Sequence, residues 1–88
     1  MLDDTLAKIK ALKAELKKLE ADHAAQAGSV AGFADAAAHE AARKPLSPKR
    51  VKLALDGLAD AASELEATHP KVAAAVAEIC RELSSLGI

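Results

Sequence analysis

Lys44-Pro45-Leu46-Ser47-Pro48 is the stretch of this 88-residue sequence that decides how the chain folds. Pro45 disfavours helical geometry at the residue before it and has no amide hydrogen to donate, so a helix ends there. Ser47 is a favourable N-cap, and Pro48 fits the first position of a new helix. The stretch therefore predicts a turn over residues 44–47 between two helical segments.

Apolar side chains recur at alternating steps of three and four residues on both sides of this turn, which is the spacing of a coiled-coil heptad repeat. The first frame consists of Leu2, Thr5, Ile9, Leu12, Leu16, Leu19, His23, Gln26, Val30, Phe33, Ala37 and Glu40. The second frame consists of Val51, Leu55, Leu58, Ala62, Leu65, His69, Val72, Val76, Ile79, Leu83 and Leu86. Because neither frame slips, we expect two helical arms, about 2–43 and about 48–86, in a single helical domain over residues 1–88.

Each arm contains one segment that weakens a helix. In the first arm Gly28, Ser29 and Gly32 lie close together, and glycine is a poor residue for the interior of a helix. In the second arm Pro70 follows His69 and interrupts the helix as Pro45 does. Since the heptad frame continues unshifted across both segments, we expect kinks or tight breaks between collinear pieces.

Folding the chain at the turn gives an all-α antiparallel helical hairpin in which large side chains oppose one another, such as Leu12 with Ile79 and Phe33 with Leu58. Two helices bury only one stripe each, so a second copy is expected to complete a dimeric four-helix bundle. The expected dimer face is made of the Ala-rich flanks Ala7, Ala14, Ala21, Ala54 and Ala61. The alternative architecture is a compact monomer of four short helices, broken at Gly28 and Pro70.

The composition agrees with a helical protein in the cytoplasm. Hydrophobic residues make up 51% of the chain and aromatic residues only 1%, which disfavours β-sheets, and a net charge of -1 argues against disorder. The single cysteine, Cys80, has no partner for an intrachain disulfide, which suits a reducing compartment. The longest apolar run, residues 72–77, is far shorter than the roughly 20 residues that span a bilayer, so we expect no membrane span.

The C-terminal quarter of the sequence carries a recognisable pattern. It contains Leu65-Glu66-Ala67-Thr68-His69-Pro70 and ends in Leu86-Gly87-Ile88. This pattern resembles the end of a small bacterial family known as domain of unknown function 4404. The resemblance implies a helical bacterial protein, and it implies no activity because the family has none assigned.

Three polar residues occupy neighbouring places in the two apolar frames. His23 comes opposite His69 in the hairpin, and Gln26 lies one turn away from His23. A zinc site needs three or four convergent ligands, and the sequence has no His-x3-His or Cys-x2-Cys spacing. We therefore favour a polar layer that fixes the register of the helices over a metal site.

Positive charge gathers around the turn. The residues concerned, here called the basic tip, are Arg43, Lys44, Lys49, Arg50 and Lys52. Lys49 and Arg50 stand at a helix N-terminus, where the helix dipole disfavours cations, so the stability of that helix does not explain them. Contact with a polyanion such as nucleic acid is one reading, and a solvated turn is the other. The chain has no Trp or Tyr, and such side chains usually stack on bases.

No constellation of catalytic residues stands out, and no cofactor is expected. The sequence therefore favours a non-catalytic helical module for self-association, as a homodimer, or for binding an unidentified protein. The alternative function is a nucleic-acid or polyanion-binding accessory protein that acts through the basic tip.

Overall fold

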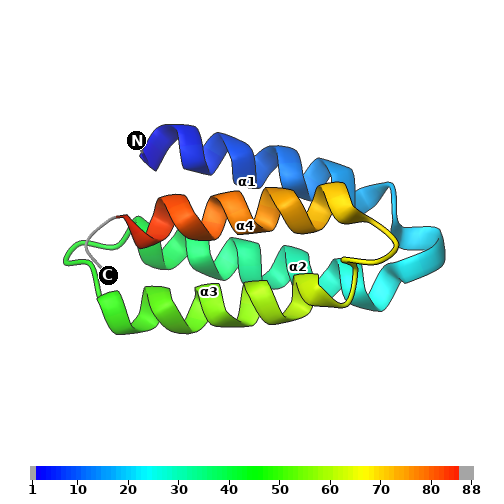
Figure 1. Cartoon of the computed structure of the whole chain (residues 1–88). Helices are drawn as coiled ribbons and strands as arrows, with labels where there is room; N and C mark the ends of the chain where they lie inside the picture. Colours follow the sequence, from blue (N-terminus) through cyan, green and yellow to red (C-terminus); the bar gives the residue numbers. More distant parts are fainter. Residues whose placement is uncertain (1, 86–88) are drawn as a thin grey trace.

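The computed structural model of the chain consists of four helices, α1 (Leu2–Lys17), α2 (Glu20–Ala41), α3 (Pro48–Ser63) and α4 (Pro70–Ser84) (Figure 1). It describes residues 2–85, without the side chains of residue 2 and residues 20–22. The terminal Leu86-Gly87-Ile88, which carries part of the resemblance, lies outside the described residues. No strand occurs in residues 2–85, so the expected all-α class is confirmed.

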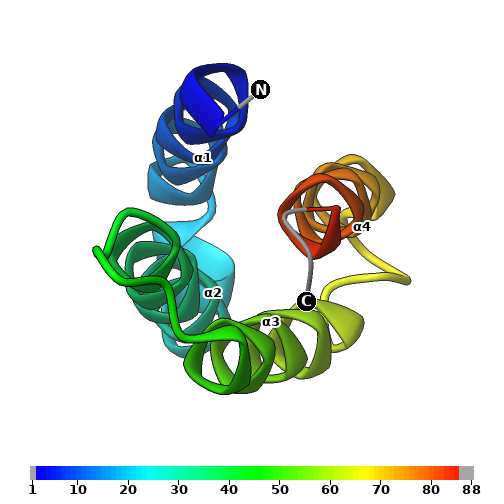
Figure 2. The same cartoon turned by 90° about the vertical axis from the view of Figure 1, so that its left-hand side faces the viewer.

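Successive helices run in opposite directions and form a bundle. Figure 1 shows α1 and α3 running one way and α2 and α4 the other. Viewed end-on, the four helices follow one another in chain order around a common centre (Figure 2), and each one packs against its two neighbours. The loop between α2 and α3 therefore lies at one end of the bundle, and the connections α1–α2 and α3–α4 lie at the other.

The expectation of two collinear arms is wrong. A continuous helix of 40 residues would be about 60 Å long, whereas the longest dimension of the molecule is 39 Å. Each arm turns back on itself, so the four short helices of the alternative architecture are present. The second arm breaks before Pro70 as expected, but the first breaks at Lys18 and Leu19, and Gly28 lies inside α2.

Local hydrogen bonds explain where α1 ends and α3 begins. The amides of Lys18 and Leu19 donate to the carbonyl oxygens three residues earlier, at 3.1 and 3.0 Å, which is the tighter pattern of a closing helical turn. Ser47 caps α3 as expected, because its side chain accepts a hydrogen bond of 3.4 Å from the amide of Arg50. Pro48 stands at the start of the same helix.

The core is made mostly of the heptad positions, but the first frame shifts in α2, where Ala27, Ala34 and Ala41 are buried in place of Gln26, Phe33 and Glu40. The largest fully buried side chains are Leu16, Leu58, Leu65, Ile79, Leu83, Val30, Val51 and Val76. Ala54, which was expected on a dimer face, is buried inside the chain's own bundle, while Ala7 and Ala14 are exposed. Phe33 belongs to the first frame yet is 40% exposed. One chain thus supplies the four-helix core for which a second copy had been expected.

The two halves of the chain are similar helix pairs. α3 covers the positions 46 residues beyond those of α1, from 2–17 to 48–63. Buried residues correspond in the same way, since Ile9 matches Leu55 and Leu12 matches Leu58. The bundle therefore resembles two copies of one helix pair joined by the loop between α2 and α3.

Candidate functional site

His23 and His69 meet at the end of the bundle where α1 passes into α2 and α3 passes into α4. Their ring centroids are 5.1 Å apart and the rings meet edge to face, at 83°. The two backbones also match, with φ of -137° at His23 inside α2 and -136° at His69 before α4. Gln26, the third residue of the expected register layer, is half-buried and makes no side-chain hydrogen bond within the described part of the chain. The structure thus brings the two histidines together without joining Gln26 to them.

A sequence repeat accompanies this pairing. Leu19-Glu20-Ala21-Asp22-His23 and Leu65-Glu66-Ala67-Thr68-His69 share four of five residues and stand 46 positions apart. In both segments the histidine amide donates to the carbonyl oxygen of the leucine, at 2.9 Å for His23 and 2.7 Å for His69. Comparing the two halves of the chain would have predicted equivalent chain reversals at both places.

Metal-binding groups do not converge in the described structure. Among the side chains described in residues 3–19 and 23–85, no three His, Cys, Asp or Glu residues come close enough to hold a metal ion. Cys80 is half-buried, with its Sγ 3.9 Å from the carbonyl oxygen of Leu55. Burial raises the pKa of the Cys80 thiol, and the negative charge of Asp56 raises it further. A thiol of this kind is a packing group and a poor nucleophile.

The basic tip lies at the end of the bundle opposite the histidines, on the loop after α2 and the first turns of α3. All five of its residues are exposed. Arg43 pairs with Glu40, with 3.3 Å between the guanidinium nitrogen and the carboxylate oxygen. The side chains of the other four tip residues make no ion pair with any carboxylate that the structure describes.

An apolar hollow adjoins the basic tip on the outer face of α2 and α3. This α2–α3 groove has a volume of about 340 Å³ and is lined by Phe33, Ala36, Glu40, Arg50, Leu53 and Ala54. Phe33 is 40% exposed and Leu53 is 62% exposed, and they are the large hydrophobic side chains left at the surface of the described residues. Leu53 lies outside the heptad frame, and a bulky apolar residue off the buried stripe is the sequence signal that would have indicated this surface.

The equivalent place between α1 and α4 is occupied by polar side chains. The 46-residue correspondence places Lys8 where Ala54 stands and Glu82 where Ala36 stands. The ammonium of Lys8 bonds Glu78 at 2.7 Å and also bonds Glu82. Thr5, which is buried, donates a hydrogen bond of 2.8 Å to Glu82. Three polar side chains thus occupy on α1–α4 the place where alanines stand on α2–α3, and the hollow beside Lys8 is smaller, at about 200 Å³.

These polar contacts shift the protonation equilibria of both charged partners. Hydrogen bonds to the carboxylates of Glu78 and Glu82 raise the pKa of Lys8. Hydrogen bonds from Lys8 and Thr5 lower the pKa of Glu82. Both shifts favour the charged forms, so the ion pair is retained across the neutral pH range.

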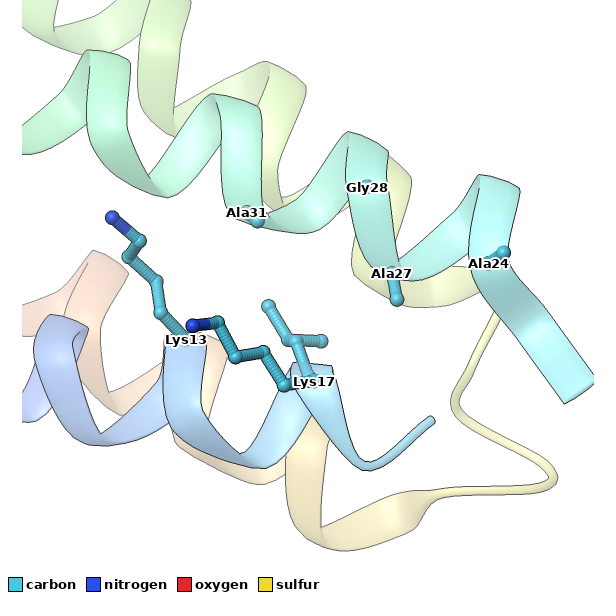
Figure 3. A pocket seen from close by; sticks show the side chains of 7 residues that line it. Lys13, Lys17, Ala24, Ala27, Gly28 and Ala31 are labelled. Carbon is cyan, nitrogen blue, oxygen red and sulfur yellow. The ribbon is translucent and has the colours of Figure 1, made fainter. Parts of the chain in front are cut away.

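A second hollow, of about 460 Å³, lies between α1 and the start of α2 (Figure 3). Lys13 and Lys17 extend from α1 beside the small side chains of Ala24, Ala27 and Ala31 on α2. The ammonium of Lys13 pairs with Asp35 at 2.7 Å. The lining consists of two lysines and small or apolar residues, which provide no acid–base pair and no activated nucleophile. We therefore interpret this hollow as a gap in the packing of α1 against α2.

The chain matches a known protein family. A family model described as a domain of unknown function (DUF4404) matches residues 2–88. The resemblance is therefore not confined to the C-terminal quarter but extends over nearly the whole chain. No curated protein and no solved structure matches the chain. Within residues 2–85, none of the helices has the length and apolar character needed to cross a membrane.

Proposed function

The chain belongs to the family described as a domain of unknown function (DUF4404), and from its own residues we propose that it is a non-catalytic helical interaction module that associates with itself. We place it in the cytoplasm of a bacterium, because its family resemblance is bacterial and its lone cysteine suits a reducing compartment. The protein interaction is assigned to the α2–α3 groove.

One observation supports this proposal above the others: the groove carries apolar side chains that the bundle leaves at its surface. Phe33 is the chain's only residue among Phe, Trp and Tyr, and it stands at the rim of the groove rather than in the core. Leu53 has 62% of its surface exposed beside it. Exposed apolar surface rimmed by charged groups, here Arg50 and Glu40, is typical of protein–protein contacts.

The proposed dimer differs from the one expected from the alanine flanks. A four-helix core inside one chain already buries Ala54, so the second copy is not needed to complete that core. The proposed dimer consists of two complete four-helix bundles that associate through their surfaces. Such a contact is reversible, because each bundle keeps its own core when the two separate.

Sedimentation velocity across the micromolar range tests this proposal. We expect a species of about twice the 9.0 kDa mass of one chain, in equilibrium with the monomer. Leu53→Asp should weaken association at least about tenfold, because it places a charge in the apolar contact. Ala7→Asp is the matched control, since Ala7 is the exposed equivalent of Leu53 on α1 and should leave association unchanged. A parent protein that stays monomeric throughout the range would refute self-association.

A second candidate function is binding of a polyanion by the basic tip. The observation in its favour is that Lys44, Lys49 and Lys52 have no acidic partner among the described side chains. Fluorescence anisotropy with a labelled DNA duplex should then show binding that weakens steeply as salt rises. Lys44→Glu with Lys49→Glu should abolish it, while Lys10→Glu with Lys17→Glu on α1 should not. Equal binding by both double variants would contradict this candidate.

A further inference from the structure

Three residues of α3 form a charged and apolar row beside the α2–α3 groove. Arg50, Leu53 and Asp56 follow one another at three-residue spacing, which places them along one face of the helix. All three are exposed, and Arg50 and Leu53 also line the groove. The row reads positive, apolar, negative along the helix axis.

Neither charge in this row is paired within the described part of the chain. The guanidinium of Arg50 makes no ion pair there. The hydrogen bond of this residue to Ser47 is donated by the backbone amide and leaves the side chain unpaired. The carboxylate of Asp56 likewise has no hydrogen bond or ion pair, and acts only through its charge on the thiol of Cys80. Both charges are therefore available to a molecule that covers Leu53.

We propose that the α2–α3 groove is covered by a second copy of this chain, with α3 packed antiparallel to α3 about a two-fold axis at Leu53, so that Arg50 of each copy faces Asp56 of the other. This inference rests on the self-association proposed above and assigns its geometry. A two-fold contact requires a surface that is complementary to itself. If one residue of the first copy contacts a second residue of the other copy, then that second residue of the first copy contacts the first residue of the other. A row with a cation three residues before a leucine and an anion three residues after it meets that requirement.

The groove adjoins the place where the exposed leucines of the two copies meet. Ala36 on α2 and Ala54 on α3 leave the hollow open, and the ring of Phe33 forms a wall beside them. With the axis at Leu53, the leucines of the two copies meet each other at the rims of these hollows, and the two charged pairs flank them. Two leucines and two ion pairs per dimer give a small interface, which agrees with a reversible contact.

The equivalent face of α1 explains why this contact is made on α3. The positions that correspond to Arg50, Leu53 and Asp56 are Asp4, Ala7 and Lys10. Alanine provides no large apolar side chain there, and the adjoining position is taken by the charged Lys8, which bonds Glu78 and Glu82. The two halves of the bundle thus differ at the surface that we propose to bind a second copy.

Charge reversal tests the pairing in the full-length protein by sedimentation velocity. Arg50→Asp alone and Asp56→Arg alone each place like charges opposite one another at two points of the dimer. Each should weaken self-association at least about tenfold. The double variant Arg50→Asp with Asp56→Arg restores both pairs in reversed order and should return the dissociation constant to within about threefold of the parent. Lys10→Asp, an exposed charge reversal on α1, is the control and should have no effect.

The outcomes separate this geometry from self-association itself. Loss of association in both single variants with recovery in the double variant supports the antiparallel α3 pairing. A parent that dimerises equally well with either single reversal, or a double variant that does not recover, overturns the pairing while self-association stands. A parent that remains monomeric overturns both. Circular dichroism of each variant confirms that the helical bundle is retained, since all three positions are at the surface.

Discussion

The ring of Phe33 lies on α3 at Gly57, where a Cβ atom would come within 2.3 Å of the ring carbon Cε1. Glycine at position 57 therefore allows α2 to seat its aromatic side chain against the neighbouring helix. That contact holds Phe33 at the wall of the α2–α3 groove, so a residue inside α3 determines the shape of the surface proposed to bind a second copy.

Gly57→Ala should displace the ring of Phe33 from this seat. The added methyl group improves helix propensity by about 1 kcal/mol, but the lost ring contact offsets that gain. We expect no net stabilisation in urea denaturation, together with weaker self-association. Gly28→Ala is the control, because nothing lies within 4 Å of the Cβ it would add, and it should stabilise the fold by about 0.5–1 kcal/mol. Equal stabilisation by both variants would show that Phe33 does not depend on Gly57.

Leu16→Ala should be strongly destabilising because Leu16 is only 2% exposed and belongs to the buried core. Large-to-small changes at such positions cost about 2–5 kcal/mol of unfolding free energy. Lys17→Ala at the adjacent exposed position should cost less than about 0.5 kcal/mol. Urea denaturation of the two variants checks the assignment of the buried face, and similar losses at both positions would contradict it.

The pH dependence of stability should report the Lys8–Glu82 pair at both ends of the scale. The pKa of Glu82 lies below its ordinary value of 4.5 in the folded chain, so the unfolded chain binds more protons in acid. Its contribution is present above pH 4.5 and is lost as pH falls through the folded value. The pKa of Lys8 lies above its ordinary 10.5, so its contribution is present below that pH and is lost as pH rises through the folded value.

Glu82→Gln measures the acidic part of this dependence. The difference in unfolding free energy between parent and variant should be constant near neutral pH. It should shrink as pH falls from 4.5 through the lower pKa of the folded state, because the unfolded parent binds a proton at Glu82 before the folded parent does. Glu64→Gln, at an exposed position with no ion pair among the described side chains, is the control and should change the unfolding free energy at neutral pH by less than about 0.5 kcal/mol. A difference between parent and Glu82→Gln that widens in acid would contradict a lowered pKa of Glu82 in the folded chain.

A double-mutant cycle should detect the contact between His23 and His69. Aromatic rings that meet edge to face contribute about 0.5–1.5 kcal/mol beyond their burial, so the effects of His23→Ala and His69→Ala should be non-additive by that amount. His39, which is exposed further along α2, provides the control. His39→Ala combined with His69→Ala should be additive within about 0.5 kcal/mol. Additivity in the His23–His69 cycle would show that the rings do not interact.

Cys80 should react slowly with a disulfide reagent while the bundle is folded. Burial and the charge of Asp56 raise the pKa of its thiol above the ordinary 9.0, and the thiolate is the reacting form. At pH 8 the native protein should react at least about tenfold more slowly than the chain unfolded in urea. Absorbance of the released thiolate follows both reactions, and equal rates would show that the thiol is open to solvent.

Part of the candidate site could be predicted from the sequence, and the repeat of the helix pair shows which part. The pairing of His23 with His69 followed from antiparallel packing about the Pro45–Pro48 turn, and the structure brings the two rings together. The groove did not follow, because Phe33 fits the buried frame and Leu53 falls outside it. Comparison of Ala54 and Ala36 with Lys8 and Glu82 across the two halves would have indicated one apolar and one charged surface.

The amino-acid sequence by itself determined the helical class, the turn before Pro48 and most of the buried positions. These follow from proline geometry, from the cap at Ser47 and from a periodicity that is the same in every helix of the bundle. Only the tertiary structure decided that each arm reverses, and that Phe33 and Leu53 remain at the surface. A heptad frame predicts which side of a helix faces the core, but it does not predict whether the chain continues straight or turns back. After the reversal at Lys18 and Leu19, the buried face of α2 shifts to Ala27, Ala34 and Ala41, each one position beyond a frame residue. The choice between a straight and a reversed chain depends on which packing buries both halves of the chain together, and that is a property of all four helices at once.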